Sequence, residues 1–183
     1  EDTLDRALDP IFPRGSGGTG LRAALDALFA KAEEAVRGGA SLLILTDRGV
    51  GRDHAPIPAL LAASGLHHHL IRTGLRTGAG LIVESGEVRE VIHVAMMIAF
   101  GANAVCPHVA LSTVRALAEQ GRLNPPVPPN AAVDHYIAAV KKGLLKTLSR
   151  MGISTIRSFL GSQIFEAVGL GPALVERYFT GTA

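Results

Sequence analysis

Short apolar runs alternate with longer segments of helical length through the middle of this chain. The runs span residues 42–46, 81–84 and 104–106, and glycine or proline residues flank them. Their length is that of strands, and the apolar run 42–46 is typical of a strand buried on both faces. Helical crossovers between consecutive strands make those strands parallel. The alternation therefore predicts an α/β fold whose short parallel strands and helices form either a partial (β/α) barrel or an open parallel sheet.

Four helices are expected around these strands. The first carries apolar residues at helical spacing and ends at the glycine pair 38–39; those apolar residues are Leu21, Leu25, Leu28, Ala32 and Val36. The other three are predicted at 56–72, 86–100 and 111–120. Ser85 is the expected N-cap of helix 86–100, because its hydroxyl can accept a hydrogen bond from the first helical turn.

Proline and glycine divide the chain into three parts. Residues 1–20 contain two prolines and the glycine-rich run 15–20, which indicates a linker or loop. Residues 21–123 form the predicted α/β core, with about three parallel strands. Residues 124–183 begin with a proline-rich loop and continue as a helical extension of the same domain, with helices expected at 131–151, 161–168 and 172–179.

Charge and composition weigh against several classes of function. The 18 basic and 16 acidic residues are dispersed, and the chain has two tyrosines and no tryptophan, so no nucleic-acid partner is expected. No membrane partner is expected either, since the longest apolar stretches, such as 91–100, are too short to span a bilayer. A single cysteine favours a reducing, cytoplasmic location. Because the chain begins without Met in a polar segment, we expect it to be a piece of a longer protein.

Several blocks of sequence carry a resemblance to a known family. They are LILTDR at 43–48, PIPALLA at 56–62, HHHLIR at 67–72, VESGEVREV at 83–91, KGLLK at 142–146, MGIST at 151–155, QIFEAVGL at 163–170 and YFTGT at 178–182. In this order they resemble the glutamate synthase large subunit, in the C-terminal part of its central, or linker, domain. The resemblance extends from about residue 9 to residue 182.

The resemblance implies a parent enzyme, an oxidoreductase and amidotransferase that converts glutamine and 2-oxoglutarate into two glutamates. In that family a glutaminase domain releases ammonia, and a synthase barrel that holds FMN and an iron–sulfur cluster uses it. The central domain lies between them and is similar to a flavin barrel without the flavin site. This segment is then expected to be non-catalytic, without a cofactor or metal of its own, and to scaffold the two catalytic domains and the ammonia path.

Two further expectations follow from this interpretation. A partial domain exposes apolar surface that its remainder would cover, so self-association of the segment is a possible outcome. The alternative function, from a different class, is a partial barrel that binds FMN or another phosphate-bearing small molecule at the carboxyl ends of its strands.

Six polar residues are candidates for structural or interface roles, and none is assigned to catalysis. Asp47 and Arg48 follow the first apolar run and Glu84 ends the second, at the strand ends where parallel folds gather functional groups. We expect an ion-pair network that includes Arg89 to close these ends, because no nucleophile and base converge there. The full set is Asp47, Arg48, His68, Glu84, Arg89 and His93.

Three conspicuous features receive structural interpretations. The run His67–His69 places successive side chains about 100° apart around a helix, whereas metal ligands on one helix face need a spacing of three or four. Cys106 is expected to be a buried thiol, since no electropositive setting that would activate it is evident. The glycine-rich run 15–20 lacks the Lys-Ser or Lys-Thr pair of a phosphate-binding loop and is interpreted as a flexible linker.

The predicted helix 131–151 has two distinct faces. Its basic residues fall near one face, which we expect to be solvated or in contact with another domain; they are Lys141, Lys142, Lys146 and Arg150. Its apolar residues are expected in the core; they are Ile137, Val140, Leu144, Leu145, Leu148 and Met151.

Overall fold

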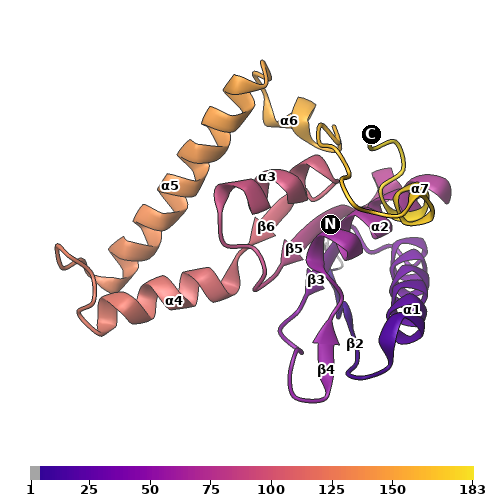
Figure 1. Cartoon of the computed structure of the whole chain (residues 1–183), viewed down its shortest axis with the longest axis horizontal. Coiled ribbons are helices and arrows are strands. Elements are labelled where there is room, and N and C mark those ends of the chain that lie inside the picture. Colours follow the sequence, from indigo (N-terminus) through magenta and orange to yellow (C-terminus); the bar gives the residue numbers. More distant parts are fainter. Residues whose placement is uncertain (1–4) are drawn as a thin grey trace.

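A parallel sheet of four strands lies at the centre of the computed structural model, which describes residues 5–183 (Figure 1). The strands are β1 (Asp5–Leu8), β3 (Leu42–Thr46), β5 (Gly80–Glu84) and β6 (Ala104–Cys106). They lie in the order β1-β3-β5-β6, so sheet neighbours follow one another along the chain. A doubly wound sheet reverses its order at a switch point, whereas a (β/α) barrel adds strands in one direction. The structure confirms the predicted α/β fold, with the strand order of a partial barrel.

The expected linker at residues 1–20 contains regular structure instead of a loop. β1 pairs with β3 in register Leu8 to Leu45, which adds a fourth parallel strand to the three predicted. β2 (Ile11–Pro13) then pairs with β4 (His54–Pro56) in a small antiparallel sheet (Figure 1). The first three residues of β1 are exposed, so this edge strand carries no apolar run that sequence patterning could detect. Residues 1–4 of the predicted linker lie outside the described residues.

Three helices connect the strands of the main sheet. α1 (Gly17–Arg37) joins β2 to β3, α2 (Ala59–Arg72) joins β4 to the 3₁₀ turn η1 (Arg76–Gly78) before β5, and α3 (Val91–Ala99) joins β5 to β6. Right-handed crossovers in a sheet that grows in one direction place all of these helices on the same face. That face holds the core, in which side chains of β3 and β5 lie beneath those of α1 and α2. The strands contribute Leu43, Leu45, Leu81 and Val83, and the helices contribute Leu25 and Leu66.

The opposite face of the sheet is only half-buried. Ile44 and Ile82, which alternate with the core residues along β3 and β5, remain partly exposed. The prediction that run 42–46 is buried on both faces is therefore wrong for these residues. Ile44 is apolar like its neighbours in the run, but it lies on the face of the sheet that helices of residues 5–183 cover only partly. The sequence of the run therefore gave no sign that only one face is fully buried.

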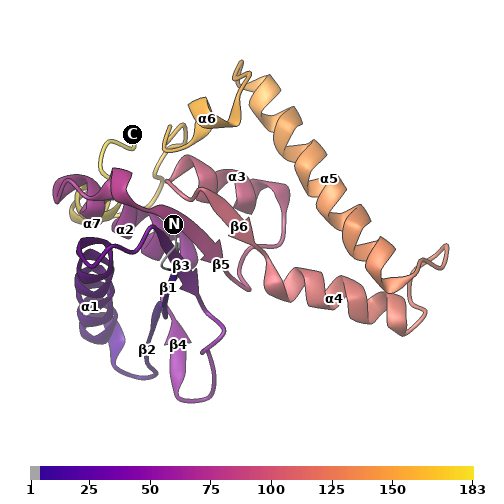
Figure 2. The ribbon, with the colours of Figure 1, turned by 180° about the vertical axis from the view of Figure 1, so that it is seen from behind.

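The last third of the chain is helical, and the described residues beyond β6 contain no strand. The elements are α4 (His108–Glu119), α5 (Pro129–Arg150), α6 (Ile156–Phe159) and α7 (Pro172–Tyr178). α4 leads away from the sheet, and α5 runs back as a long outer arm that contacts α4 and α3 (Figures 1 and 2). α7 returns to pack against α2, close to α1 (Figure 2).

The helix predicted at 161–168 is absent from the structure. Gly161 and Gln163 both have positive φ angles, 69° and 51°, which interrupt a right-handed helix. Their backbone N–H groups donate instead to the carbonyls of Ile98 and Ala99 at the end of α3, at 3.1 and 3.0 Å. Tertiary hydrogen bonds to α3 therefore replace the local helical bonds that the sequence suggested.

Candidate functional site

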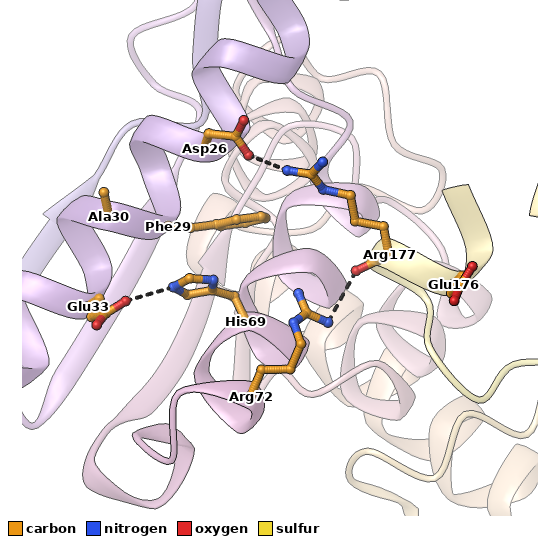
Figure 3. Close-up of a pocket in the computed structure, with 8 residues that line it drawn as sticks. All are labelled: Asp26, Phe29, Ala30, Glu33, His69, Arg72, Glu176 and Arg177. Atoms are coloured by element: carbon orange, nitrogen blue, oxygen red, sulfur yellow. Dashed lines mark hydrogen bonds and ion pairs between the residues drawn. The ribbon is translucent and has the colours of Figure 1, made fainter. Parts of the chain in front are cut away.

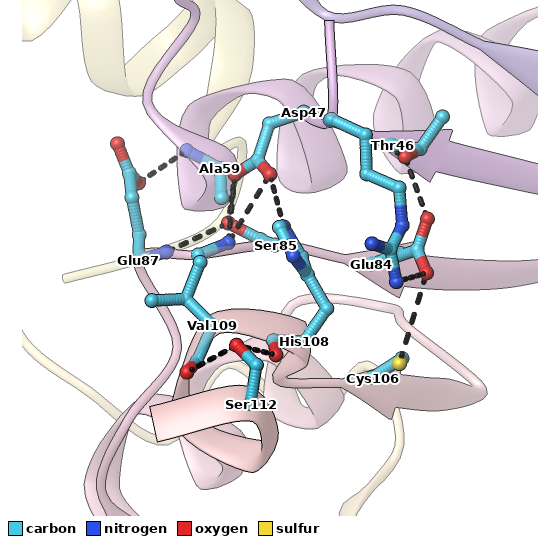
Figure 4. A network of polar contacts seen from close by, with 12 residues as sticks. Thr46, Asp47, Ala59, Glu84, Ser85, Glu87, Cys106, His108, Val109 and Ser112 are labelled. Atoms are coloured by element: carbon cyan, nitrogen blue, oxygen red, sulfur yellow. Dashed lines mark hydrogen bonds and ion pairs between the residues drawn. The ribbon is translucent and has the colours of Figure 1, made fainter. Parts of the chain in front are cut away.

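The Asp47 carboxylate joins three strand ends at the carboxyl edge of the sheet (Figure 4). Its Oδ2 accepts hydrogen bonds from Ser85 Oγ at 2.6 Å and from the Gly86 N–H at 2.9 Å. Its Oδ1 lies 2.7 Å from Nε2 of His108, the first residue of α4. The Asp47 and His108 side chains are 10% and 14% exposed, so water has little access to these bonds. One carboxylate thus ties the end of β3 to the loop after β5 and to the start of α4.

Glu84 makes a second set of contacts beside this cluster (Figure 4). Its carboxylate accepts from Thr46 Oγ1 at 2.7 Å and pairs with Arg48 Nη2 at 2.9 Å. The hydrogen bond from Arg48 and then that from Thr46 hold the pKa of Glu84 below its usual value, while Glu84 raises the pKa of Arg48. Glu84 is therefore ionised at neutral pH, which suits an ion pair and not a general acid.

Cys106 completes this edge of the sheet, with Sγ 3.9 Å from Glu84 Oε1. Burial, and next the negative charge of Glu84, raise the pKa of the Cys106 thiol. A thiol with a raised pKa is protonated at neutral pH, and the thiolate is the nucleophilic form. The cysteine is half-buried and chemically passive in this setting.

Arg89 and His93 do not join the predicted strand-end network. His93 Nδ1 accepts from the backbone N–H groups of Arg89 and Glu90, at 3.2 and 3.3 Å, and so caps the start of α3. The carbonyl of Arg89 accepts from the hydroxyl of Tyr136 in α5 at 2.9 Å. The roles proposed for these two residues at an interface stay predictions.

The loop between β5 and α3 explains why helix α3 begins later than expected. Ser85 was predicted as an N-cap, but its hydroxyl donates to Asp47 and α3 starts only at Val91. Glu87 in the same loop accepts from the Ala59 N–H at 2.8 Å and thereby satisfies a free donor at the start of α2. The residues between Glu84 and Val91 stay outside α3 because Ser85 bonds to Asp47, next to β3, and Glu87 bonds to the start of α2.

The three consecutive histidines enter three different environments. His67 Nδ1 accepts from Arg76 Nε at 2.8 Å, and burial, followed by the charge of Arg76, lowers the pKa of His67 to about 4. His68 is buried, which lowers its pKa, and its Nε2 has no hydrogen-bond partner among residues 5–183. His69 Nε2 lies 3.1 Å from Glu33 Oε2. Across the described part of the chain, no three His, Cys, Asp or Glu side chains are grouped to hold a metal ion.

Arg76 organises the opposite, amino-terminal edge of the sheet. Beyond its bond to His67, its guanidinium donates to the carbonyls of Ala79 and Gly101, both at 2.8 Å, and to Asn103 Oδ1 at 2.9 Å. Asn103 Oδ1 also accepts from the Leu81 N–H at 2.9 Å. Sequence reasoning missed Arg76, Asn103 and the His108–Asp47 contact because each joins residues remote along the chain and follows no spacing rule.

A small cavity lies at the carboxyl ends of β3 and β5, on the side that α2 covers. The cavity bounded by Asp47, Ile57, Val83 and Ser85 measures about 10 Å³, at the lower limit for one water molecule. The Asp47 clamp and the Arg48–Glu84 pair occupy the position where a barrel would bind a ligand.

Larger depressions lie elsewhere on the molecule, and two of them are enclosed by several helices. A groove of about 540 Å³ lies between α1, α2 and α7, where Asp26 pairs with Arg177 at 2.6 Å and Arg72 Nη1 donates to the Arg177 carbonyl at 3.3 Å (Figure 3). A smaller apolar pocket of about 260 Å³ lies between β6, α3, α4 and α5. In the groove Asp26 pairs with Arg177 and Glu33 lies beside His69, whereas Arg72 and Glu176 form no ion pair within residues 5–183.

Comparison with known sequences matches the whole length of the chain. The model of the family described as "Glutamate synthase central domain" matches residues 2–171. The NADPH glutamate synthase large chain of Bacillus subtilis is 47% identical over 182 residues, covering 100% of this chain and 12% of that relative. The NADH glutamate synthase of Schizosaccharomyces pombe is 35% identical over 177 residues, covering 97% of this chain and 8% of that one. Ferredoxin-dependent glutamate synthase 2 of Synechocystis is 44% identical over 179 residues, covering 91% and 11%.

Comparison with solved structures shows the fold. A flavocytochrome b2 variant with benzoylformate superposes with a TM-score of 0.59 at 15% identity, over 82% of this chain and 38% of that one. The recombinant flavin-binding domain of baker's yeast flavocytochrome b2 gives a TM-score of 0.55 at 16% identity, over 85% and 38%. These are barrel-like proteins, which agrees with the strand order described above.

Proposed function

The chain belongs to the glutamate synthase central-domain family, and we propose that it is a non-catalytic part of a glutamate synthase that holds the glutaminase and FMN-binding synthase domains in register. Its mechanism is geometric. A rigid α/β body fixes the distance between the site that releases ammonia and the site that consumes it, and shields the path between them from water. FMN and the iron–sulfur cluster belong, in this proposal, to other parts of the parent chain.

The closure of the strand ends is the observation that carries this proposal. In a catalytic barrel this edge is open and lined by groups from several strands. Here Asp47 accepts from Ser85 and lies 2.7 Å from His108, and Glu84 pairs with Arg48 beside them, so these polar groups bond to one another across strand ends. Side chains that fully satisfy one another stiffen the edge and leave little to offer a substrate.

The relatives support placing the chemistry elsewhere. The chain spans between 8 and 12% of the length of three relatives that are named for NADPH, NADH and ferredoxin. All three match this segment at 35–47% identity. A segment shared by enzymes named for different electron donors is a poor candidate for selecting the donor.

The location remains a prediction. Among residues 5–183 no helix is long and apolar enough to cross a membrane. The cytoplasmic location expected from the sequence and the possible self-association of the segment stay proposals, to be checked by fractionation and by sedimentation of the purified chain.

Alanine at Asp47 in a full-length glutamate synthase carrying this segment tests the scaffolding role. We expect both half-reactions, glutamine hydrolysis and synthesis from free ammonia, to keep their rates. The amount of glutamine hydrolysed per glutamate formed should rise, because ammonia escapes when the two sites lose their register. A large loss of either half-reaction in a protein that remains folded would instead make this edge part of a catalytic site.

Titration of the chain with FMN tests the alternative small-molecule function. Binding to the folded state alone at a hundred times Kd stabilises a protein by about 2.7 kcal/mol. We expect no change in flavin fluorescence and no rise in melting temperature. Saturable binding with a raised melting temperature would favour the flavin-binding partial barrel over the scaffold.

A further inference from the structure

The outward face of α5 concentrates the positive charge of the chain. Lys141, Lys142, Lys146 and Arg150 are all exposed there. They include three of the four lysines in the whole sequence, the other being Lys31 on α1. We call Lys141, Lys142, Leu145, Lys146 and Arg150 the cationic face of α5. At 100° per residue these five fall within about half of the helix circumference.

The acidic residues nearest to this face along the chain are Asp134, about two helical turns before Lys141, and Glu166, beyond the end of α5. Residues 135–165 contain five basic and no acidic residues, whereas the remainder contains 13 basic and 16 acidic residues. Within residues 5–183, no ion pair involves the cationic face of α5; the pairs use Glu33, Glu84, Asp47 and Asp26 instead. Like charges on successive turns of one helix destabilise it slightly, and the helix dipole favours only Arg150, in the last turn of α5.

An exposed leucine lies in the middle of the charges. Leu145 is 64% exposed, while its neighbours Leu144 and Leu148 are 7% and 2% exposed and face the body of the protein. The prediction that Leu145 belongs to the core is therefore wrong. α5 forms the outer side of the molecule in both views (Figures 1 and 2).

The chemistry of the face selects one class of partner. An apolar side chain ringed by charged groups has the anatomy of a protein interface, whose centre is dry and whose rim is polar. Single-stranded nucleic acid would call for exposed aromatic side chains, and the cationic face of α5 has none. A membrane surface would call for a broad apolar face on the helix, whereas this one offers a single leucine.

We propose that the cationic face of α5 docks on an acidic protein surface of another domain of the parent chain, with Leu145 filling an apolar depression at the centre of the contact. The inference rests on the proposed function, in which this segment joins larger domains of one chain. Opposite charges orient such a contact and suppress wrong partners, and the buried leucine adds to its affinity.

Lysine acetylation measures this contact directly. A full-length glutamate synthase carrying this segment is labelled with an N-hydroxysuccinimide ester of acetate, and mass spectrometry follows each lysine in the native and the denatured protein. We expect Lys142 and Lys146 to label several-fold more slowly in the native protein. At about 1 M salt the Debye length falls to roughly 3 Å, so the protection should weaken. Equal labelling of both lysines in the two states would overturn the proposal.

Charge reversal distinguishes protection of Lys146 by docking from an acetylation of Lys146 that is slow for another reason. The double change Lys142→Glu and Arg150→Glu should restore fast labelling of Lys146, whereas the matched change Lys31→Glu should leave Lys146 protected. Circular dichroism establishes that each variant is folded, as expected for substitutions at exposed positions. If Lys146 becomes protected only after poly(U) RNA or phosphatidylserine vesicles are added, the partner is not protein and the proposal fails.

The coupling ratio in the same samples distinguishes this inference from the proposed function. Protection of Lys146 that charge reversal removes, with an unchanged ratio of glutamine hydrolysed to glutamate formed, would support docking and refute the scaffolding role. Absence of protection in the unmodified protein would refute docking whatever the ratio.

Discussion

Replacement of Asp47 by alanine should cost far more stability than replacement of an exposed aspartate. The Asp47 carboxylate accepts from Ser85 Oγ and the Gly86 N–H and lies 2.7 Å from His108 Nε2, and its side chain is 10% exposed. A hydrogen bond to a charged group contributes about 1.5–3 kcal/mol, and donors left unpaired in a poorly hydrated site add a desolvation cost. Allowing for water that enters beside the truncated side chain, we expect a loss of about 3 kcal/mol.

Thermal unfolding of the 183-residue chain, followed by circular dichroism, measures this loss. For a chain of this size each kcal/mol lowers the melting temperature by about 2–4 °C, so Asp47→Ala should lower it by about 6–12 °C. The matched control is Asp26→Ala, since Asp26 pairs with Arg177 at 2.6 Å but its side chain is 51% exposed. An exposed pair contributes about 0–1 kcal/mol. If the two variants melt at the same temperature, the strand-end clamp does not hold the fold together as argued.

Three further predictions concern other parts of the structure. The pKa of His67 falls from 6.5 in the unfolded chain to about 4 in the folded chain, so the unfolded chain binds more protons between these pH values. The free energy of unfolding should therefore drop as the pH falls from 6.5 towards 4. His67→Gln should reduce this pH dependence, as measured by urea unfolding at several pH values. Gly143→Ala should destabilise the fold because the added Cβ would lie 2.5 Å from a valine methyl of α3. Gly18→Ala, where the added Cβ meets open space, should stabilise α1 by up to about 1 kcal/mol. Equal shifts of the melting temperature in the two variants would contradict this. Leu148→Ala should cost about 2–5 kcal/mol in denaturant unfolding and Leu145→Ala under about 0.5 kcal/mol, and equal losses would mean that α5 is packed differently.

The strands show which parts of the fold the pattern of apolar residues could predict. Apolar runs flanked by glycine or proline located β3, β5 and β6 to within a residue, because the local pattern is itself the product of burial. β1 was missed since an edge strand with three exposed residues leaves no such pattern. The partial exposure of Ile44 was also missed, because the residue type alone does not show whether another part of the chain packs against it.

The strand-end site was only partly predictable. Asp47, Arg48 and Glu84 could be placed together because parallel strands bring their carboxyl ends to one edge. The Ser85 and His108 contacts depend on how a loop and a helix turn back, which no spacing records. Arg89 was assigned to the same network, but it lies five residues after the end of β5, where its carbonyl accepts from Tyr136 of α5.

By itself the sequence determined the class of fold, the positions of three strands and most helices, and the family, since each of these depends on residues that are close together along the chain. The tertiary structure alone decided that Asp47 bonds to Ser85 and lies beside His108, that the three histidines face different surroundings and that Leu145 is exposed. These features depend on which remote segments meet, and such meetings are set by the packing of the whole chain and not by any local pattern.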